Sequence, residues 1–210
     1  TIPLNEIISM PASSPYYPIP PALYRHAKFY FVYFHADPLD IDRILPECFT
    51  QIDQGYVANG ISIPWSANYG AFEESVVTVP CAFEGKAGYF TPVVFLNSRS
   101  SIPAGREIYG TPKVFAGITV NMDEHVMIIG TRLVGASVLN FRSTMHQEAS
   151  IDDKPVLKPK WRLKVYLEQV EGVDVMQLID VSDVITDVKV HVWRSGDVVV
   201  GFEPTLVFDL

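Results

Sequence analysis

Short runs of β-branched and aromatic residues, separated by turn residues, most limit the folds open to this 210-residue chain. In one run Val188, Val190 and Val192 alternate with polar or amphipathic neighbours, the period of two expected of a strand with two different faces. Glu171-Gly172 is a typical turn between two such runs. The expected strands include Phe29–His35, Gly88–Leu96, Val126–Leu133, Val138–Ser143, Arg162–Val170, Val173–Val181 and Val184–Trp193. Sequential strands of this kind predict a mainly antiparallel sheet that closes into a barrel or packs as a sandwich.

One helix interrupts this pattern. The segment from Asp37 to Pro46 begins with an Asp-Pro pair, which suits an N-cap and a first helical turn. Its apolar residues share one face, and Pro46 ends it. We therefore expect few, short helices in a mainly β (α+β) fold.

The N-terminal segment has a different character. Six of the 16 prolines lie within the first 21 residues, which excludes a regular helix there. We expect residues 1–23 to form an extended arm that lies on another surface. No linker, repeat or low-complexity segment divides the remainder, so residues 1–210 are interpreted as a single domain.

The balance of charged residues limits the partners that the protein can bind. Sixteen Lys and Arg residues against 24 Asp and Glu residues give a net charge of −8, without a compensating basic block. Such a field repels phosphate backbones and anionic lipids, so we expect no nucleic acid and no membrane partner. The apolar runs are shorter than the roughly 20 residues of a spanning helix. The N-terminus has no signal-peptide pattern, which predicts a cytoplasmic location.

The sequence lacks the motifs of several well-known catalytic and cofactor-binding sites. The chain contains no G-x-S-x-G, G-x-G-x-x-G or Walker sequence. Its five histidines show no metal-ligand spacing, and Cys48 and Cys81 form no C-x-x-C pair. We expect neither a metal nor another cofactor.

The unusual stretch is 104–118, in which Lys113 follows a Gly-Thr-Pro turn and has apolar neighbours on both sides. The other lysines at 154, 158, 160 and 164 belong to a polar region. Burial disfavours the ammonium form, and the neutral amine of Lys113 could then attack a carbonyl carbon. Local composition equally allows Lys113 to reach the surface at the start of a strand.

Gly105-Arg106-Glu107 followed by Pro112-Lys113 resembles the active-site segment of the acetoacetate decarboxylase family, whose lysine forms a Schiff base with a keto acid. The resemblance continues in order through 24–45, 82–89, 158–166 and 178–193. It implies a cone-like antiparallel β-barrel with an apolar interior that holds the lysine, assembled into homo-oligomers. Similar proteins continue past the position of Leu210, so we expect the C-terminal end of the fold to be incomplete.

The chain also departs from the family. The second lysine that follows the nucleophile in the decarboxylases is replaced by Val114. Glu74 aligns with one acidic residue of the family's site, whereas another acidic position falls at Asn59. The family's active-site arginine near the first strand falls near Ala27 or Lys28. These departures bear on substrate specificity more than on the nucleophile.

The resemblance implies a Schiff-base-forming lyase that decarboxylates a small β-keto acid such as acetoacetate, with Lys113 as nucleophile and Glu74 as proton carrier. Glu74 could instead be a solvated loop carboxylate. Arg106 could bind the substrate carboxylate with Glu107 beside it, or the two could form a structural ion pair. Tyr109 and Phe29 could contact the substrate.

Two alternatives stay open. With a 2-oxo acid such as pyruvate, the same imine could lose a methyl proton, and the resulting enamine could add to an aldehyde and then lose water. Some acetoacetate decarboxylase-like proteins without the full residue set perform this aldol condensation and dehydration. The second alternative is a non-catalytic barrel that binds a small carbonyl compound, with Lys113 as a passive contact.

Overall fold

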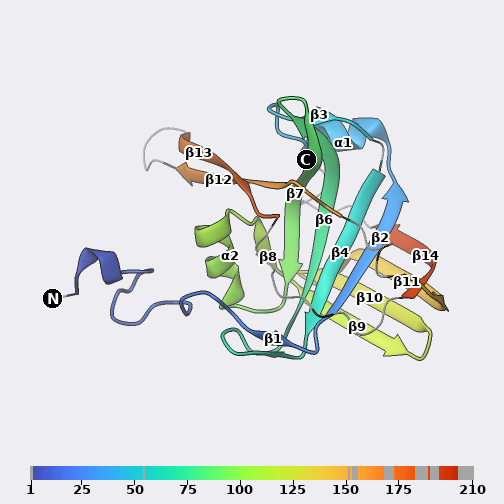
Figure 1. Cartoon of the computed structure of the whole chain (residues 1–210), viewed down its shortest axis with the longest axis horizontal. Coiled ribbons are helices and arrows are strands. Elements are labelled where there is room, and N and C mark those ends of the chain that lie inside the picture. Colours follow the sequence, from blue (N-terminus) through green and yellow to red (C-terminus); the bar gives the residue numbers. More distant parts are fainter. Residues whose placement is uncertain are drawn as a thin grey trace.

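The computed structural model describes residues 2–53, 55–150, 152, 156–167, 173–182, 189 and 194–202, which form a mainly β structure (Figure 1). The helices are η1 (Leu4–Glu6), α1 (Pro38–Ile44) and α2 (Ser101–Tyr109). The strands are β1 (Tyr24–Arg25), β2 (Lys28–His35), β3 (Thr50–Gln51), β4 (Gly55–Ile63), β5 (Trp65–Ser66), β6 (Phe72–Phe83), β7 (Lys86–Leu96), β8 (Lys113–Phe115), β9 (Gly117–Asp123), β10 (Val126–Leu133), β11 (Ala136–Glu148), β12 (Lys160–Leu167), β13 (Val173–Asp180) and β14 (Arg194–Phe202).

One large sheet carries most of these strands. Its order is β13-β12-β7-β6-β4-β2, with β3 paired to β6 and β8 paired to β7. Most neighbours are antiparallel, but β8 and β12 both run parallel to β7. A second sheet has the order β14-β11-β10-β9 and lies to the lower right of β2 and β4 in Figure 1. Among the described strands no hydrogen-bonded path closes either sheet into a barrel.

The main core lies between the two sheets. Alternate residues of the large sheet, such as Tyr30, Val77 and Phe95, pack in one cluster with Ile129 and Leu139 of the smaller sheet. The period of two therefore divides the large sheet into a face that packs on the core and an opposite face. The opposite face is where the candidate site lies.

The expected helix is confirmed as α1, in which the Asp37 side chain accepts a hydrogen bond from the Leu39 amide and Pro38 opens the first turn. The second helix, α2, was not expected. Strands at 29–35, 88–96 and 138–143 are confirmed within longer elements, and the strand at 126–133 is confirmed with the same bounds as β10. The predicted strand Val184–Trp193 lies outside the described residues except for Lys189. No helix in the described part of the chain is long and apolar enough to cross a membrane.

Candidate active site

Lys113 is the first residue of β8, paired with Val94 of β7, and its side chain is only 11% exposed. Its Nζ donates a hydrogen bond to Ser101 Oγ at 2.9 Å and lies 3.1 Å from Glu74 Oε2. Lys113 is therefore not a surface lysine, and the alternative that it reaches the solvent at the start of a strand is wrong. An amine with so little exposure, beside one carboxylate and one hydroxyl, can exchange its proton directly with the carboxylate.

Glu74 reaches Lys113 because of its place in the sheet. It lies within β6, opposite Ile61 of β4 and Leu96 of β7, so it is not a loop carboxylate. Leu96 and Val94 share a face on β7, and Lys113 is paired with Val94. This register places the amine and the carboxylate on the face turned away from the core.

The backbone at Glu74 is fixed from the core side. The Tyr30 hydroxyl donates to the Glu74 carbonyl oxygen at 3.0 Å. Gly60 makes this contact possible, since a Cβ there would lie 2.1 Å from the Tyr30 hydroxyl. The neighbouring Glu73 is held differently, because its carboxylate accepts from Asn97 Nδ2 at 2.6 Å. Only Glu74 of the two acidic neighbours contacts Lys113.

Gly105 of α2 gives the Lys113 side chain its path. A Cβ at Gly105 would lie 2.5 Å from Lys113 Cδ and 2.6 Å from Cε. The aliphatic part of the lysine therefore runs against the bare backbone of the helix. The Lys113 amine then donates its hydrogen bond to the hydroxyl of Ser101, one turn earlier in α2.

We expect Gly105→Ala to lower activity about 100-fold without loss of fold, because an ångström-scale displacement of a reacting group costs about that factor. Alanine raises helix propensity by about 1 kcal/mol, and the displaced atoms belong to a flexible side chain. Urea unfolding and steady-state rates would check both parts. Gly201→Ala, at a strand glycine of β14 with nothing within 4 Å of its added Cβ and no left-handed backbone, is the control for the substitution itself. Full activity in Gly105→Ala would contradict the proposed path.

The other predicted site residues have different surroundings. Arg106 is exposed, and its Nη1 donates to the backbone carbonyl of Lys113 at 3.2 Å. Glu107 accepts a 2.7 Å hydrogen bond from the hydroxyl of Tyr17 in the N-terminal arm. The alternative of an Arg106–Glu107 ion pair is wrong, because the two side chains have these other partners and consecutive helical residues point in different directions. That Arg106 binds a substrate carboxylate stays a prediction.

Tyr109 ends α2, and Phe29 lies in β2. Burial, followed by the neighbouring Tyr69, Glu74 and Tyr109, raises the pKa of Tyr24 above its ordinary value. Tyr24 is thus within electrostatic reach of both Tyr109 and Glu74. Phe29 is opposite Ile61, which is itself opposite Glu74, so Phe29 lies on the same sheet face with 36% of its surface exposed.

The residues at which this chain departs from the family pattern can also be located in the structure. Asn59 is buried in β4, and its Nδ2 donates to Thr78 Oγ1 at 3.3 Å. Ala27 packs beside the apolar cluster of Ile61, Ile63 and Phe72, whereas Lys28 is exposed. Neither residue near the first strand supplies a buried cation to this face.

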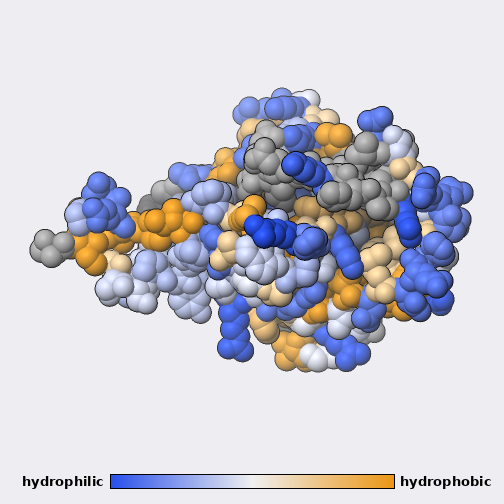
Figure 2. Space-filling model, turned by 60° about the horizontal axis from the view of Figure 1, so that its bottom comes forward, coloured by the Kyte–Doolittle hydropathy of each residue, from blue (hydrophilic) through white to orange (hydrophobic). Residues whose placement is uncertain are grey.

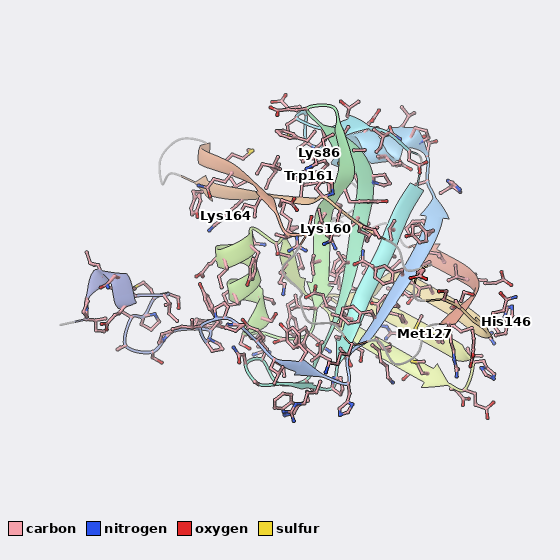
Figure 3. All side chains as sticks on the ribbon, in the orientation of Figure 1. Lys86, Met127, His146, Lys160, Trp161 and Lys164 are labelled. Atoms are coloured by element: carbon pink, nitrogen blue, oxygen red, sulfur yellow. The ribbon has the colours of Figure 1, made fainter. Side chains whose placement is uncertain are left out.

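Two cations that sequence reasoning missed come from β12. Lys160 was assigned to a polar region and Arg162 only to an expected strand, yet both are half-buried. Trp161, between them, packs with Phe90 on the other side of the strand. Figure 3 shows Lys160 and Trp161 where β12 crosses beside β7, and Lys164 further along the strand above α2. The alternation of Lys160, Arg162 and Lys164 with apolar residues is the signal that marks one cationic face.

Burial affects the protonation of both missed residues. Burial, and then the positive charge of Arg162, lower the pKa of Lys160 to about 8, against a smaller opposing effect of Glu74. Burial likewise lowers the pKa of Arg162 to about 10, again opposed by Glu74. The charge of Glu74 therefore reaches both β12 cations.

The lowered pKa of Lys160 predicts a pH dependence of stability. In the unfolded chain Lys160 loses its proton near pH 10.5, but in the fold near pH 8. Between these values the unfolded chain binds more protons, so the free energy of unfolding rises with pH. Urea unfolding at about pH 7 and about pH 9.5 should show the native protein gaining stability relative to Lys160→Met. A difference that does not change with pH would contradict the burial of this amine.

With this geometry described, comparison with known families shows one match. The family model described as acetoacetate decarboxylase matches residues 9–208. Among curated proteins, acetoacetate decarboxylase 2 of Mesorhizobium japonicum is 26% identical over 170 residues, which cover 78% of this chain and 64% of that protein. Acetoacetate decarboxylase of Acidiphilium cryptum is 27% identical over 168 residues, covering 78% of this chain and 68% of that protein. The matched region thus spans about two thirds of the length of these relatives.

Solved structures share the fold. The crystal structure of acetoacetate decarboxylase from Legionella pneumophila superposes with a TM-score of 0.82 at 25% identity, covering 97% of this chain and 82% of that one. The enduracididine biosynthesis enzyme MppR complexed with pyruvate superposes with a TM-score of 0.76 at 18% identity, covering 95% and 85% of the two chains. The second likeness concerns the fold alone.

Proposed function

The chain belongs to the acetoacetate decarboxylase family, and on that premise we propose that it is a carboxy-lyase that decarboxylates a small β-keto acid through a Schiff base on Lys113. The observation that carries the proposal is the buried Lys113 amine, 3.1 Å from Glu74 Oε2 and 2.9 Å from Ser101 Oγ. An amine so placed can transfer its proton to the carboxylate and attack a ketone as a neutral nucleophile.

The proposed steps consume one proton net, and the water released on imine formation is returned at hydrolysis. The amine adds to the ketone and water leaves, which forms a protonated imine. The bond between the α-carbon and the carboxylate carbon breaks, its electron pair moves to the imine nitrogen, and CO₂ departs. The enamine takes a proton at carbon, and water then hydrolyses the imine. Glu74 carries these protons and stabilises the cationic imine.

A pyruvate-type aldolase-dehydratase is the second candidate. It would use the same imine, and Val114 stands where the decarboxylases have their second lysine. MppR, which shares the fold, has been solved with pyruvate and with the condensation product of pyruvate and imidazole 4-carboxaldehyde. A third candidate is a non-catalytic barrel in which Lys113 only contacts a bound ligand.

One pair of assays separates these candidates. We expect CO₂ release from acetoacetate, and no change in absorbance with pyruvate and an enal. The reverse result would support the aldolase-dehydratase. Borohydride should trap a keto acid on Lys113 in both enzymes. Absence of labelling with a panel of keto acids, in folded protein, would leave the non-catalytic alternative.

We also propose that the strands close into the cone-like barrel that the family resemblance implies. The packing of the two sheets around one core supports this proposal. A crystal structure in which the sheets remain open would contradict it.

Homo-oligomeric assembly is a further proposal, supported by the N-terminal arm. Leu4, Met10, Tyr16, Ile19 and Leu23 are exposed on it. Figure 2 shows apolar surface along this projecting arm. A second copy would remove that surface from water. Sedimentation velocity should show an assembly that Leu4→Ser with Ile19→Ser weakens, and a monomeric native protein would contradict it.

A further inference from the structure

Two unneutralised cations line the sheet face that carries Lys113. Lys160 and Arg162 alternate with Trp161 on β12, so both lie on the side of the strand opposite the aromatic cluster. The Nη1 of Arg162 donates to the Thr111 hydroxyl, two residues before Lys113. This bond ties the guanidinium to the segment that leads into the candidate nucleophile.

The groups that contact Lys160 and Arg162 do not neutralise their positive charges. Arg162 Nε is buried and has no hydrogen-bond partner. Across the described residues the side-chain ion pairs are Arg43–Asp40 and Lys113–Glu74, so neither β12 cation has a carboxylate in contact. Glu74 acts on both through its charge but is already engaged by Lys113. A buried guanidinium edge and an amine without a counter-ion favour an anionic ligand.

The chemistry of decarboxylation decides which anion this would be. When CO₂ leaves, the negative charge of the departing carboxylate moves toward the imine nitrogen. Cations that hold that carboxylate stabilise the ground state more than the transition state, and so slow the reaction. Two cations are therefore useful only against a carboxylate that is kept in the product.

We propose that Lys160 and Arg162 form a subsite for a second, retained carboxylate, and that the substrate is a β-keto diacid. The inference rests on the proposed function. One carboxylate, β to the ketone that condenses with Lys113, leaves as CO₂. The other carboxylate accepts hydrogen bonds from Arg162 Nε and from the Lys160 amine. It stays bound until the product imine is hydrolysed.

Matched substrates test the subsite. We would compare 3-oxopentanedioate and 3-oxohexanedioate with 3-oxopentanoate and 3-oxohexanoate, which have the same length but lack the second carboxylate. The kcat/KM of the diacids should exceed that of the monoacids by about tenfold or more, the usual effect of one charged hydrogen bond. In Arg162→Met that ratio should fall about tenfold, mainly through KM, and Lys160→Met should lower it further in the double variant.

Controls keep the two proposals separate. Lys164→Met changes the third cation of the same strand, whose Nζ is already engaged 5.1 Å from the centre of the Tyr166 ring, and should leave the diacid-to-monoacid ratio unaltered. Borohydride labelling of Lys113 by acetoacetate shows that each variant retains its site, and Arg162→Gln replaces any Arg162→Met protein that fails to fold. Monoacids turned over as well as diacids, with a ratio insensitive to Arg162, would overturn the subsite while the lyase stands. If no keto acid labels Lys113 or releases CO₂, the proposed function fails and the subsite with it.

Discussion

Lys113→Ala is expected to abolish turnover, with a loss on the order of 10⁴-fold or more, as for other enzymes that lose their nucleophile. The imine cannot form without the amine, and no other lysine of the described chain is in contact with Glu74. Borohydride treatment with acetoacetate should add mass to the peptide containing Lys113 in the native protein. The variant should show no labelled peptide.

The variant needs a structural control, since it leaves Glu74 at 17% exposure without its partner. Lys113→Met keeps the aliphatic contact with Gly105 and should lose activity equally. Lys164→Ala, on the same sheet, should keep both labelling and turnover. Residual CO₂ release above the uncatalysed rate in folded Lys113→Met, or a label on another lysine, would refute the assignment of the nucleophile.

The strands could be predicted from the sequence because each one carries its own signal. Tyr30 and Val32 face the core while their neighbours do not, and α1 has its capping Asp37 and its terminal proline. The helix α2 was missed because Pro103 and Gly105 are poor helix formers. Pro103 is tolerated because it lies in the first turn, where the amide needs no intrahelical partner. Gly110, at φ 60° after the helix, was the available signal for its end.

The site was only partly predictable, because it depends on contacts between distant strands. Lys113 was identified by its apolar neighbours and by family resemblance, and Glu74 by resemblance. Lys160 and Arg162 were missed because an alternation of cations usually indicates a solvated face. Their half-burial follows from the parallel pairing of β12 with β7 and from the contact of Arg162 with Thr111, 51 residues earlier in the chain. No local pattern specifies that pairing.

Glu74→Gln is expected to lower kcat by about 10²- to 10⁴-fold, the usual contribution of a general acid-base group, with a smaller change in KM. Glutamine keeps the volume and can still accept a hydrogen bond from the Lys113 amine, but it cannot carry a proton or neutralise a cationic imine. Steady-state rates with acetoacetate measure the loss. Glu73→Gln is the matched control, since Glu73 is held by Asn97 and does not contact Lys113, and it should retain activity within about twofold.

Borohydride trapping of the imine distinguishes two ways in which Glu74→Gln could lower kcat. If Glu74 acts mainly after imine formation, by stabilising the cationic imine and protonating the enamine, Glu74→Gln will still label at Lys113 with borohydride while CO₂ release falls. If it acts mainly by accepting the proton of the Lys113 ammonium, labelling and turnover will fall together. The 3.1 Å separation between Nζ and Oε2 serves both steps, because the imine nitrogen is the same atom. A kcat within about twofold of the native enzyme would exclude Glu74 from proton transfer altogether.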